Sequence, residues 1–217
     1  MLERIITWMP QLLKGARTTI IITIISVSIG LVLAVFLALG KMSKHKILNM
    51  PCRAYIFFFR GTPLLMQIYF IYFGLPQLNP KLTIRSAFVA ALIAYVLNTA
   101  AYLAENIRAG IESIDKGQFE ASKALGLTYG QTMRLVIIPQ TVRRLIPPVG
   151  NEFIMVLKDV SLVAIIGLTD LTKVTRAISS SSATALVYIP AMILYLIITA
   201  FFTFIFNKLE HRYSVYQ

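Results

Sequence analysis

The sequence has very few of the residues that form cross-links or hold metals. Its 217 residues include one cysteine, Cys52, so no disulfide can form within the chain. The two histidines, His45 and His211, lie far apart in basic polar stretches, which argues against a zinc site. No histidine, cysteine or paired carboxylates have a spacing typical of a catalytic centre. We therefore expect no catalytic residues and no bound metal.

Charged residues are also scarce, and acidic ones are the scarcest. Only 14% of the residues are charged, where a soluble domain has about 25%. The chain is 57% hydrophobic with a mean hydropathy of +0.74, which indicates an integral membrane protein. The net charge of +12 then favours loops held on the cytoplasmic side of a membrane over a nucleic-acid partner. No cleavable signal peptide is evident, because the apolar run near the amino terminus is too short.

Long apolar runs predict an all-α protein with a single domain over residues 1–217. A spanning helix needs about 20 apolar residues to cross a hydrocarbon core of ~30 Å. We expect five spans, the second of which is interrupted by Arg60-Gly61-Thr62-Pro63, preceded by an interfacial segment over residues 1–16. The spans cover approximately residues 17–41, 54–74, 85–105, 145–169 and 183–206.

The basic residues predict which loops face the cytoplasm. Loop 41–53 contains Lys41, Lys44, Lys46 and Arg53 and no acid, and segment 108–144 adds six basic residues. With five spans these two loops fall on the same side, as does the carboxyl terminus. The amino terminus is then outside. The less basic connections 75–85 and 170–182 are expected to be external loops.

The longest polar insertion, residues 108–144, predicts two short helices joined by a bend. Asp115 is placed to cap the first helix, and Gly126 suits the left-handed position after its end. Thr128 starts the second helix with a glutamine three residues later, the spacing of a capping box. Pro139 is expected to close or kink that helix.

The first of these helices predicts a docking surface. Phe119, Ala121 and Leu125 are expected to form a small apolar ridge on it. A helix this short has too little apolar surface to anchor in lipid, so the ridge favours contact with a protein partner.

Three motifs carry a resemblance to a known family. Glu120-Ala121-Ser122, then Gly126 and Val136-Ile137-Ile138-Pro139 nine residues further on, resembles the EAA loop of ABC importer permeases. The family pattern is E-A-A, three residues, G, nine residues, I-x-L-P, and this chain departs from it mildly at three positions. The stretches FFFRGTPLLMQ (57–67) and GNEFIMVLKDVSLV (150–163) resemble the histidine, arginine and glutamine permeases of the polar amino acid uptake branch.

The resemblance implies a type I importer permease in a bacterial plasma (inner) membrane. Its EAA loop would be a coupling helix that docks on a cytoplasmic ATPase. The implied partners are two ATPase subunits, a second permease copy or close paralogue, an extracytoplasmic substrate-binding protein and the lipid bilayer. The residues expected to contact the ATPase are Phe119, Glu120, Ala121, Ser122, Leu125 and Gly126.

The chain itself is expected to bind no cofactor, with ATP and Mg²⁺ held by the partner ATPase. It contains no G-x-x-x-x-G-K-[ST] loop to cradle phosphates. Gly40-Lys41 is followed by methionine, and Val35 stands where the first glycine of that motif is needed.

Three charges interrupt the fourth apolar segment. A charge at the bilayer centre costs roughly 2.5–3.5 kcal/mol on insertion scales, so these side chains must face protein or a wet cavity. Glu152 and Asp159 are seven residues apart and project from nearly the same helix face, with Met155 between them. Lys158 points about 100° away from that face. The arrangement predicts a path for a charged solute.

An α-amino acid substrate requires hydrogen-bond donors beside acceptors. We expect its site to include Glu152, Asp159, Lys158, Asn98, Tyr69 and Thr62. In spans two to four, three acidic residues stand against two basic ones: Glu105, Glu152 and Asp159 against Arg60 and Lys158. This surplus favours a basic amino acid over glutamine, glutamate or another small solute.

Structural roles remain open for the same residues. Lys158 and Asp159 can form an internal ion pair, and Asn98 can join two helices by a hydrogen bond. Arg60 either meets the substrate carboxylate or extends to the cytoplasmic surface, while Glu105 is expected to pair with Arg108. An ATP-independent secondary transporter or channel is the alternative from another functional class.

Overall fold

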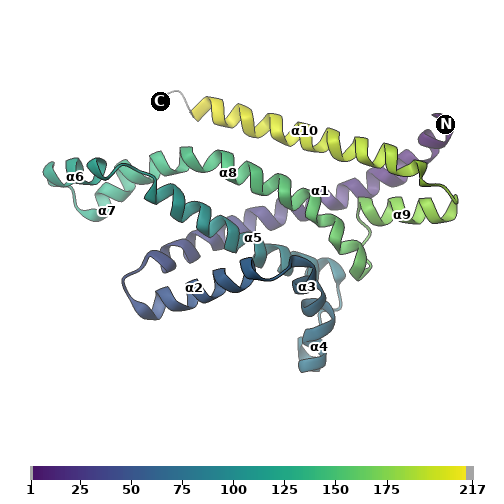
Figure 1. The fold of residues 1–217 in the computed structure, drawn as a ribbon, viewed down its shortest axis with the longest axis horizontal. Coiled ribbons are helices and arrows are strands. Elements are labelled where there is room, and N and C mark those ends of the chain that lie inside the picture. Colours follow the sequence, from purple (N-terminus) through teal and green to yellow (C-terminus); the bar gives the residue numbers. More distant parts are fainter. Residues whose placement is uncertain (1, 214–217) are drawn as a thin grey trace.

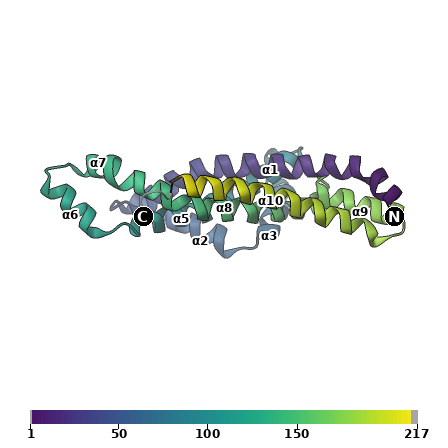
Figure 2. The ribbon, with the colours of Figure 1, turned by 90° about the horizontal axis from the view of Figure 1, so that it is seen from above.

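The computed structural model describes residues 2–213, and every regular element within that range is a helix. The long helices form an elongated bundle, and the α6–α7 segment projects from one end of it (Figures 1 and 2). The longer helices are α1 (Leu2–Met42), α2 (Lys46–Gly61), α5 (Ala87–Glu112), α8 (Ile138–Asp159) and α10 (Tyr188–Tyr213). The shorter helices are α3 (Leu64–Tyr69), α4 (Leu75–Leu78), α6 (Lys116–Ala124), α7 (Tyr129–Thr132) and α9 (Leu171–Ser181).

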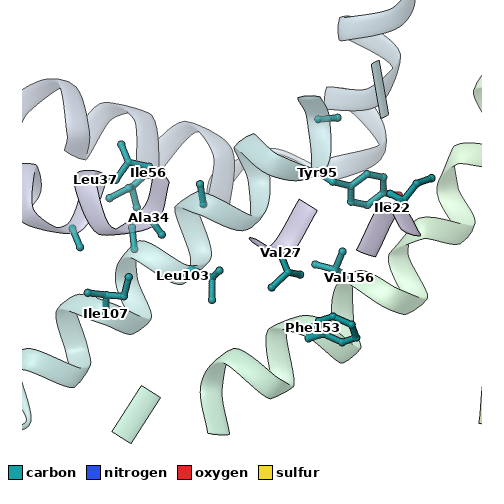
Figure 3. Close-up of a cluster of buried hydrophobic side chains, with 14 of the residues drawn as sticks. Ile22, Val27, Ala34, Leu37, Ile56, Tyr95, Leu103, Ile107, Phe153 and Val156 are labelled. Atoms are coloured by element: carbon teal, nitrogen blue, oxygen red, sulfur yellow. The ribbon is translucent and has the colours of Figure 1, made fainter. Parts of the chain in front are cut away.

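Small residues allow α1 and α5 to pack closely along their length. A Cβ on Gly30 of α1 would lie 3.2 Å from Cγ2 of Thr99 on α5, so the two backbones approach where glycine leaves room. Six alanines of α5 are fully or almost fully buried, and α8 and α2 pack against the same helix. Figure 3 shows Val27 and Leu37 of α1 in one cluster with Leu103 of α5 and Phe153 of α8.

The amino-terminal segment differs from the interfacial helix predicted for residues 1–16. From Leu2 onward the chain is the first part of α1 and continues without a break, with Pro10 inside the helix. Trp8 and Leu12 are buried in a second cluster formed with α9 and the start of α10. This packing fixes the segment as an extension of α1, because its apolar side chains have protein partners.

The predicted break in the second span is confirmed. α2 ends at Gly61, α3 begins at Leu64, and the helical segment Leu64–Leu78 is bent by 105° from α2. Thr62 has extended backbone angles, as expected for a residue before proline, and Pro63 is in the extended region too. A π-helical turn at Phe70–Gly74 then links α3 to α4.

The fourth predicted span is only partly apolar. α8 begins earlier than predicted, at Ile138, and after Asp159 the chain tightens into a 3₁₀ segment at Val160–Ile166. Within residues 2–213, three helices are long and apolar enough to cross a membrane, and the bent α2–α3–α4 segment would make a fourth. α8 is not among them, so the count of five spans stays a prediction.

Residues 170–182, predicted to be an external loop between two spans, contain a helix that the sequence did not predict. They form α9 with its ends, and the Asp170 carboxylate caps the helix by accepting from the backbone N–H groups of Thr172 and Lys173. Leu171, Thr175 and Ile178 are buried on one face of α9, which packs against α1. The buried face and the Asp170 cap stabilise a helix here although the segment is polar in composition.

Candidate functional site

A cavity of about 310 Å³ lies where the broken second span meets α5 and α8. We call it the membrane cavity. Four of the predicted substrate residues line it, namely Thr62, Asn98, Glu152 and Asp159. These residues come from three separate segments of the chain, which the fold brings together. The cavity is also lined by Arg60, Gly61, Pro63, Leu64, Tyr95, Thr99, Tyr102, Met155 and Val156.

The two carboxylates enter the membrane cavity from one face of α8. Glu152, Met155 and Asp159 all line it, as their spacing predicted. Glu152 is only 7% exposed, and within residues 2–213 its carboxylate has no hydrogen bond or ion pair. Among the residues that the structure describes, Arg60 is the one basic residue of the lining, which leaves the cavity with a surplus negative charge. Such a lining suits a ligand that carries a positive charge.

Asn98 has the structural role that the sequence left open, and it lines the membrane cavity as well. Its side-chain amide donates to the carbonyl of Phe59 at 3.1 Å and to Oε1 of Gln67 at 3.0 Å. Gln67 in turn donates to Phe59, to the backbone carbonyl of Thr62 and to the Thr62 hydroxyl. These bonds hold both sides of the break in the second span against α5.

Two predicted substrate residues lie outside the membrane cavity. Tyr69 is on α3, which the 105° bend directs away from the line of α2, and its ring packs against Phe73. Lys158 is exposed on another face of α8 and forms no salt bridge with Asp159 within the described residues. Tyr69 was expected two helical turns beyond Thr62 and near the substrate, an expectation that did not allow for a bend of this size.

Sequence reasoning missed Tyr95 and Gln67. The Tyr95 hydroxyl donates to the backbone carbonyl of Asp159 at 2.6 Å, at the point where α8 ends and the 3₁₀ segment begins. For Gln67 a signal was present in the sequence. A glutamine just after a helix break can donate to the carbonyl groups that the break leaves without helical partners.

Glu105 forms a larger charge cluster than the predicted pair with Arg108. Arg108 donates to the Glu105 carboxylate through Nε at 3.2 Å and Nη2 at 2.9 Å, so that pair is confirmed. Lys41 of α1 also donates to this carboxylate, and Nη1 of Arg60 lies 3.7 Å from it. Arg60 does not simply extend to the surface, because its guanidinium also lies 5.3 Å from the centre of the Tyr102 ring.

The predicted bend in the EAA loop is confirmed in detail. Asp115 caps α6 by accepting from the backbone N–H of Gly117, and Gly126 follows the helix with a φ of +76°. Thr128 and Gln131 form the predicted capping box. Pro139 does not close the second helix, because a π-helical turn at Met133–Ile137 widens it just before the proline and α8 continues.

The predicted apolar ridge on α6 is only partly correct. Phe119 is half-buried and packs inward against the main core, so it does not share a surface with Ala121 and Leu125. Ser122 is buried and donates to the carbonyl of Gln118, while Glu120 is exposed. Leu125 is 81% exposed and Tyr129 is 72% exposed, which makes these two residues the apolar tip of the projection.

A comparison with protein families identifies the chain. Residues 9–215 match the sequence profile described as "Binding-protein-dependent transport system inner membrane component". The chain belongs to this family. As a member of the family, it is a multi-pass inner-membrane protein.

Three relatives of this inner membrane component match it along nearly the whole chain. The glutamine transport system permease protein GlnP of Escherichia coli (strain K12) is 37% identical and covers 95% of this chain and 94% of that protein. The arginine transport system permease protein ArtQ of Bacillus subtilis (strain 168) is 39% identical over 94% and 92% of the two chains. The probable amino-acid ABC transporter permease protein YckA of the same organism is 38% identical over 95% and 91%.

Solved structures agree with this assignment. The crystal structure of an amino acid ABC transporter with histidines superposes with a TM-score of 0.90 at 38% identity, covering 96% of this chain and 97% of that one. The inward-facing MetNI methionine ABC transporter has a TM-score of 0.78 at 19% identity, which shows a shared fold.

Proposed function

We propose that this chain is the membrane-spanning permease subunit of an ABC importer for polar amino acids, with a preference for basic ones. The charged lining of the membrane cavity is the observation that supports this proposal. Two carboxylates, Glu152 and Asp159, face one guanidinium across a space bounded by a broken helix. Broken helices at membrane depth are tolerated where they line a substrate cavity. The relatives named for glutamine and arginine transport support an amino acid as the substrate.

The charge balance of the cavity favours a basic amino acid. Arg60 supplies a donor for an α-carboxylate, and the two acids remain for an α-ammonium and a positively charged side chain. Glu105 does not enter this count, because three basic side chains surround it. A neutral substrate such as glutamine would leave one acid of the cavity without a cationic partner.

The energy for transport is supplied by separate ATPase subunits, which would hold ATP and Mg²⁺. The α6–α7 projection (Figure 2) is the surface proposed to dock on them. Leu125 and Tyr129 are its strongly exposed apolar residues. Arg144 ties the base of the projection to the bundle by donating to the carbonyl and the hydroxyl of Ser113. A push on the tip is therefore transmitted to α5 and α8, which line the membrane cavity together with the broken second span.

The complete importer would contain a second permease copy or a close paralogue and an extracytoplasmic substrate-binding protein. The projection lies in the cytoplasm, the amino terminus outside and the carboxyl terminus inside. Helix α10 exposes Phe201, Phe204, Leu196 and Met192, an apolar face that suits lipid or the second copy.

ATP-driven uptake by a reconstituted complex of permease, ATPase and binding protein tests this proposal. Leu125→Asp places a charge on the docking tip and is expected to reduce uptake at least about tenfold, the loss of a contact worth about 1.4 kcal/mol. Leu82→Asp is the matched control, because Leu82 is an exposed leucine in a connection far from the projection. Equal uptake by the two variants, both inserted in the membrane, would remove the docking role from this tip.

A further inference from the structure

A second and larger cavity shares a wall with the membrane cavity. It has a volume of about 960 Å³ and lies among the end of α1, the length of α2 from Asn49 to Gly61 and the end of α5. We call it the inner cavity, because Glu112 lines it and α5 ends there, just before the projecting loop begins. Arg60 and Gly61 line both cavities, and within the described residues no other side chain is common to the two linings.

The shared wall depends on the side chain of Arg60. Gly61 has no side chain, and among the described residues no heavy atom beyond its chain neighbours and its own helix backbone lies within 4 Å of the position where its Cβ would be. The guanidinium of Arg60 lies between Glu105 and the ring of Tyr102, and Tyr102 lines the membrane cavity. Arg60 is thus the group whose movement would join the two cavities.

Arg60 is the most weakly held of the three cations around Glu105. Lys41 and Arg108 both form hydrogen bonds with the Glu105 carboxylate, whereas Arg60 approaches to 3.7 Å without one. If Arg60 leaves, Glu105 keeps two cationic partners and does not become an unpaired buried charge. The move therefore requires little more than the loss of one long ion pair and of the contact with Tyr102.

The charge balance of the cluster favours an anion as the group that draws Arg60 away from Glu105. Within the described part of the chain, the salt bridges of this cluster join three basic residues, Lys41, Arg60 and Arg108, to two acids, Glu105 and Glu112. The inner cavity adds a further basic residue, Arg53. An α-carboxylate would offer Arg60 two oxygens in bidentate geometry, which its present contact with Glu105 does not provide.

We propose that Arg60 is the gate between the membrane cavity and the inner cavity, and that the α-carboxylate of the substrate releases it from Glu105. This inference rests on the proposed function, since it requires an amino acid in the membrane cavity. Arg60 acts both as the contact for the carboxylate and as the partition that the bound substrate opens toward the inner side.

Cysteine labelling across the gate tests the partition. The probe is Met155→Cys in a Cys52→Ser background, because Met155 lines the membrane cavity and is 51% exposed. A charged, membrane-impermeant methanethiosulfonate is added to the loop side of sealed inside-out vesicles that contain the complex. Arg60→Ala and Glu105→Gln are each expected to raise the labelling rate at least about tenfold, a change of about 1.4 kcal/mol.

Lys41→Ala is the matched control for the labelling test. Lys41 binds the same carboxylate but lines only the inner cavity, so its removal is expected to change the rate by less than about twofold. Equal labelling of the parent protein, Arg60→Ala and Glu105→Gln would overturn the gate. Glu105→Gln retains the Arg60 side chain and removes only its ionic partner, so the test remains decisive if Arg60→Ala fails to assemble.

The role of the substrate α-carboxylate is tested by ligand protection in detergent, where reagents reach both faces of the permease. Arginine and its decarboxylated analogue agmatine are compared as protectants of the Met155→Cys thiol. With Arg60 present, arginine is expected to protect at a concentration at least about tenfold lower than agmatine, and with Arg60→Ala the two are expected to be equal. An unchanged ratio in Arg60→Ala would overturn the inference. Normal ATP-driven uptake by the parent complex would show that the proposed function survives such a result.

Discussion

The side-chain amide of Asn98 in α5 donates a 3.0 Å hydrogen bond to the amide oxygen of Gln67 in α3. Gln67 uses its own N–H groups for the carbonyls that the break in the second span leaves free. The Asn98–Gln67 pair therefore has two roles. It stabilises the break between α2 and α3, and it holds Asn98 at the wall of the membrane cavity. A bilayer offers no water to replace such bonds.

Gln67→Ala is expected to lower the stability of the permease. It removes the hydrogen bonds that the buried Gln67 side chain donates to the partly buried carbonyls of Phe59 and Thr62, at a cost of about 1–3 kcal/mol. For a chain of this length, each kcal/mol corresponds to roughly 2–4 °C in the midpoint of thermal unfolding. Thermal unfolding in detergent measures the change, with Gln77→Ala at an exposed position of α4 as the control. Equal midpoints for the two variants would show that Gln67 does not hold the break.

The bend of the EAA loop is expected to depend on the backbone freedom of Gly126. Gly126→Ala should destabilise the α6–α7 turn by about 1 kcal/mol, because φ is +76° and the cost comes from the left-handed backbone. A Cβ at this position would have open space around it, so no side-chain clash contributes. Amide hydrogen exchange in the loop is expected to increase.

Gly130→Ala is the matched control for Gly126→Ala. Gly130 also has open space for a Cβ, but it lies within α7 and has no positive φ. Alanine is the better helix former, so this variant is expected to leave exchange unchanged or to slow it. Faster exchange in Gly130→Ala than in Gly126→Ala would contradict the account of the turn.

Glu152→Gln is expected to reduce transport of arginine more than transport of glutamine. The substitution keeps the shape of the buried Glu152 side chain and removes one of the two carboxylates of the membrane cavity. A hydrogen bond to a charged group is worth about 1.5–3 kcal/mol, so uptake of arginine at subsaturating concentration should fall roughly tenfold or more. Glu210→Gln, at an exposed position near the end of α10, is the control. Equal effects of Glu152→Gln on the two amino acids would remove Glu152 from substrate choice.

Asp170 is expected to make stability depend on pH in the acidic range. Burial raises the pKa of its carboxyl above the ordinary value of 3.8, although the backbone N–H groups of Thr172 and Lys173 oppose the shift. A raised carboxyl pKa in the folded state contributes stability at pH below the unfolded value, and this contribution is lost as pH rises through the folded value.

Two substitutions of Asp170 separate its charge from its capping role. Asp170→Asn keeps a capping side chain and is expected to remove this part of the pH dependence, while Asp170→Ala should cost about 0.5–2 kcal/mol through loss of the cap. Unfolding midpoints between pH 3.5 and 6 measure both effects. A pH profile of Asp170→Asn that matches the parent protein would rule out Asp170 as the source.

Features set by local chemistry were predictable from the sequence. The break before Pro63, the left-handed Gly126 and the cap at Asp115 follow from the backbone preferences of single residues. The shared face of Glu152 and Asp159 follows from the helical repeat. These parts of the site needed no knowledge of the other helices.

Features set by packing between distant segments were not predictable. The extension of α1 to Leu2 depends on a cluster of Trp8 and Leu12 with α9, which no local pattern reveals. Glu105 pairs with residues of α1 and α2 that are 64 and 45 positions away in the sequence. Tyr69 was misplaced because the angle of the break, unlike its position, is set by the bonds of Gln67.

Uptake of radiolabelled arginine into proteoliposomes tests the central claim most directly. The account predicts ATP-dependent accumulation when permease, ATPase and binding protein are reconstituted together, and none when the purified permease is present alone. Accumulation of arginine by the permease alone, at the rate of the full complex and without ATP, would contradict it.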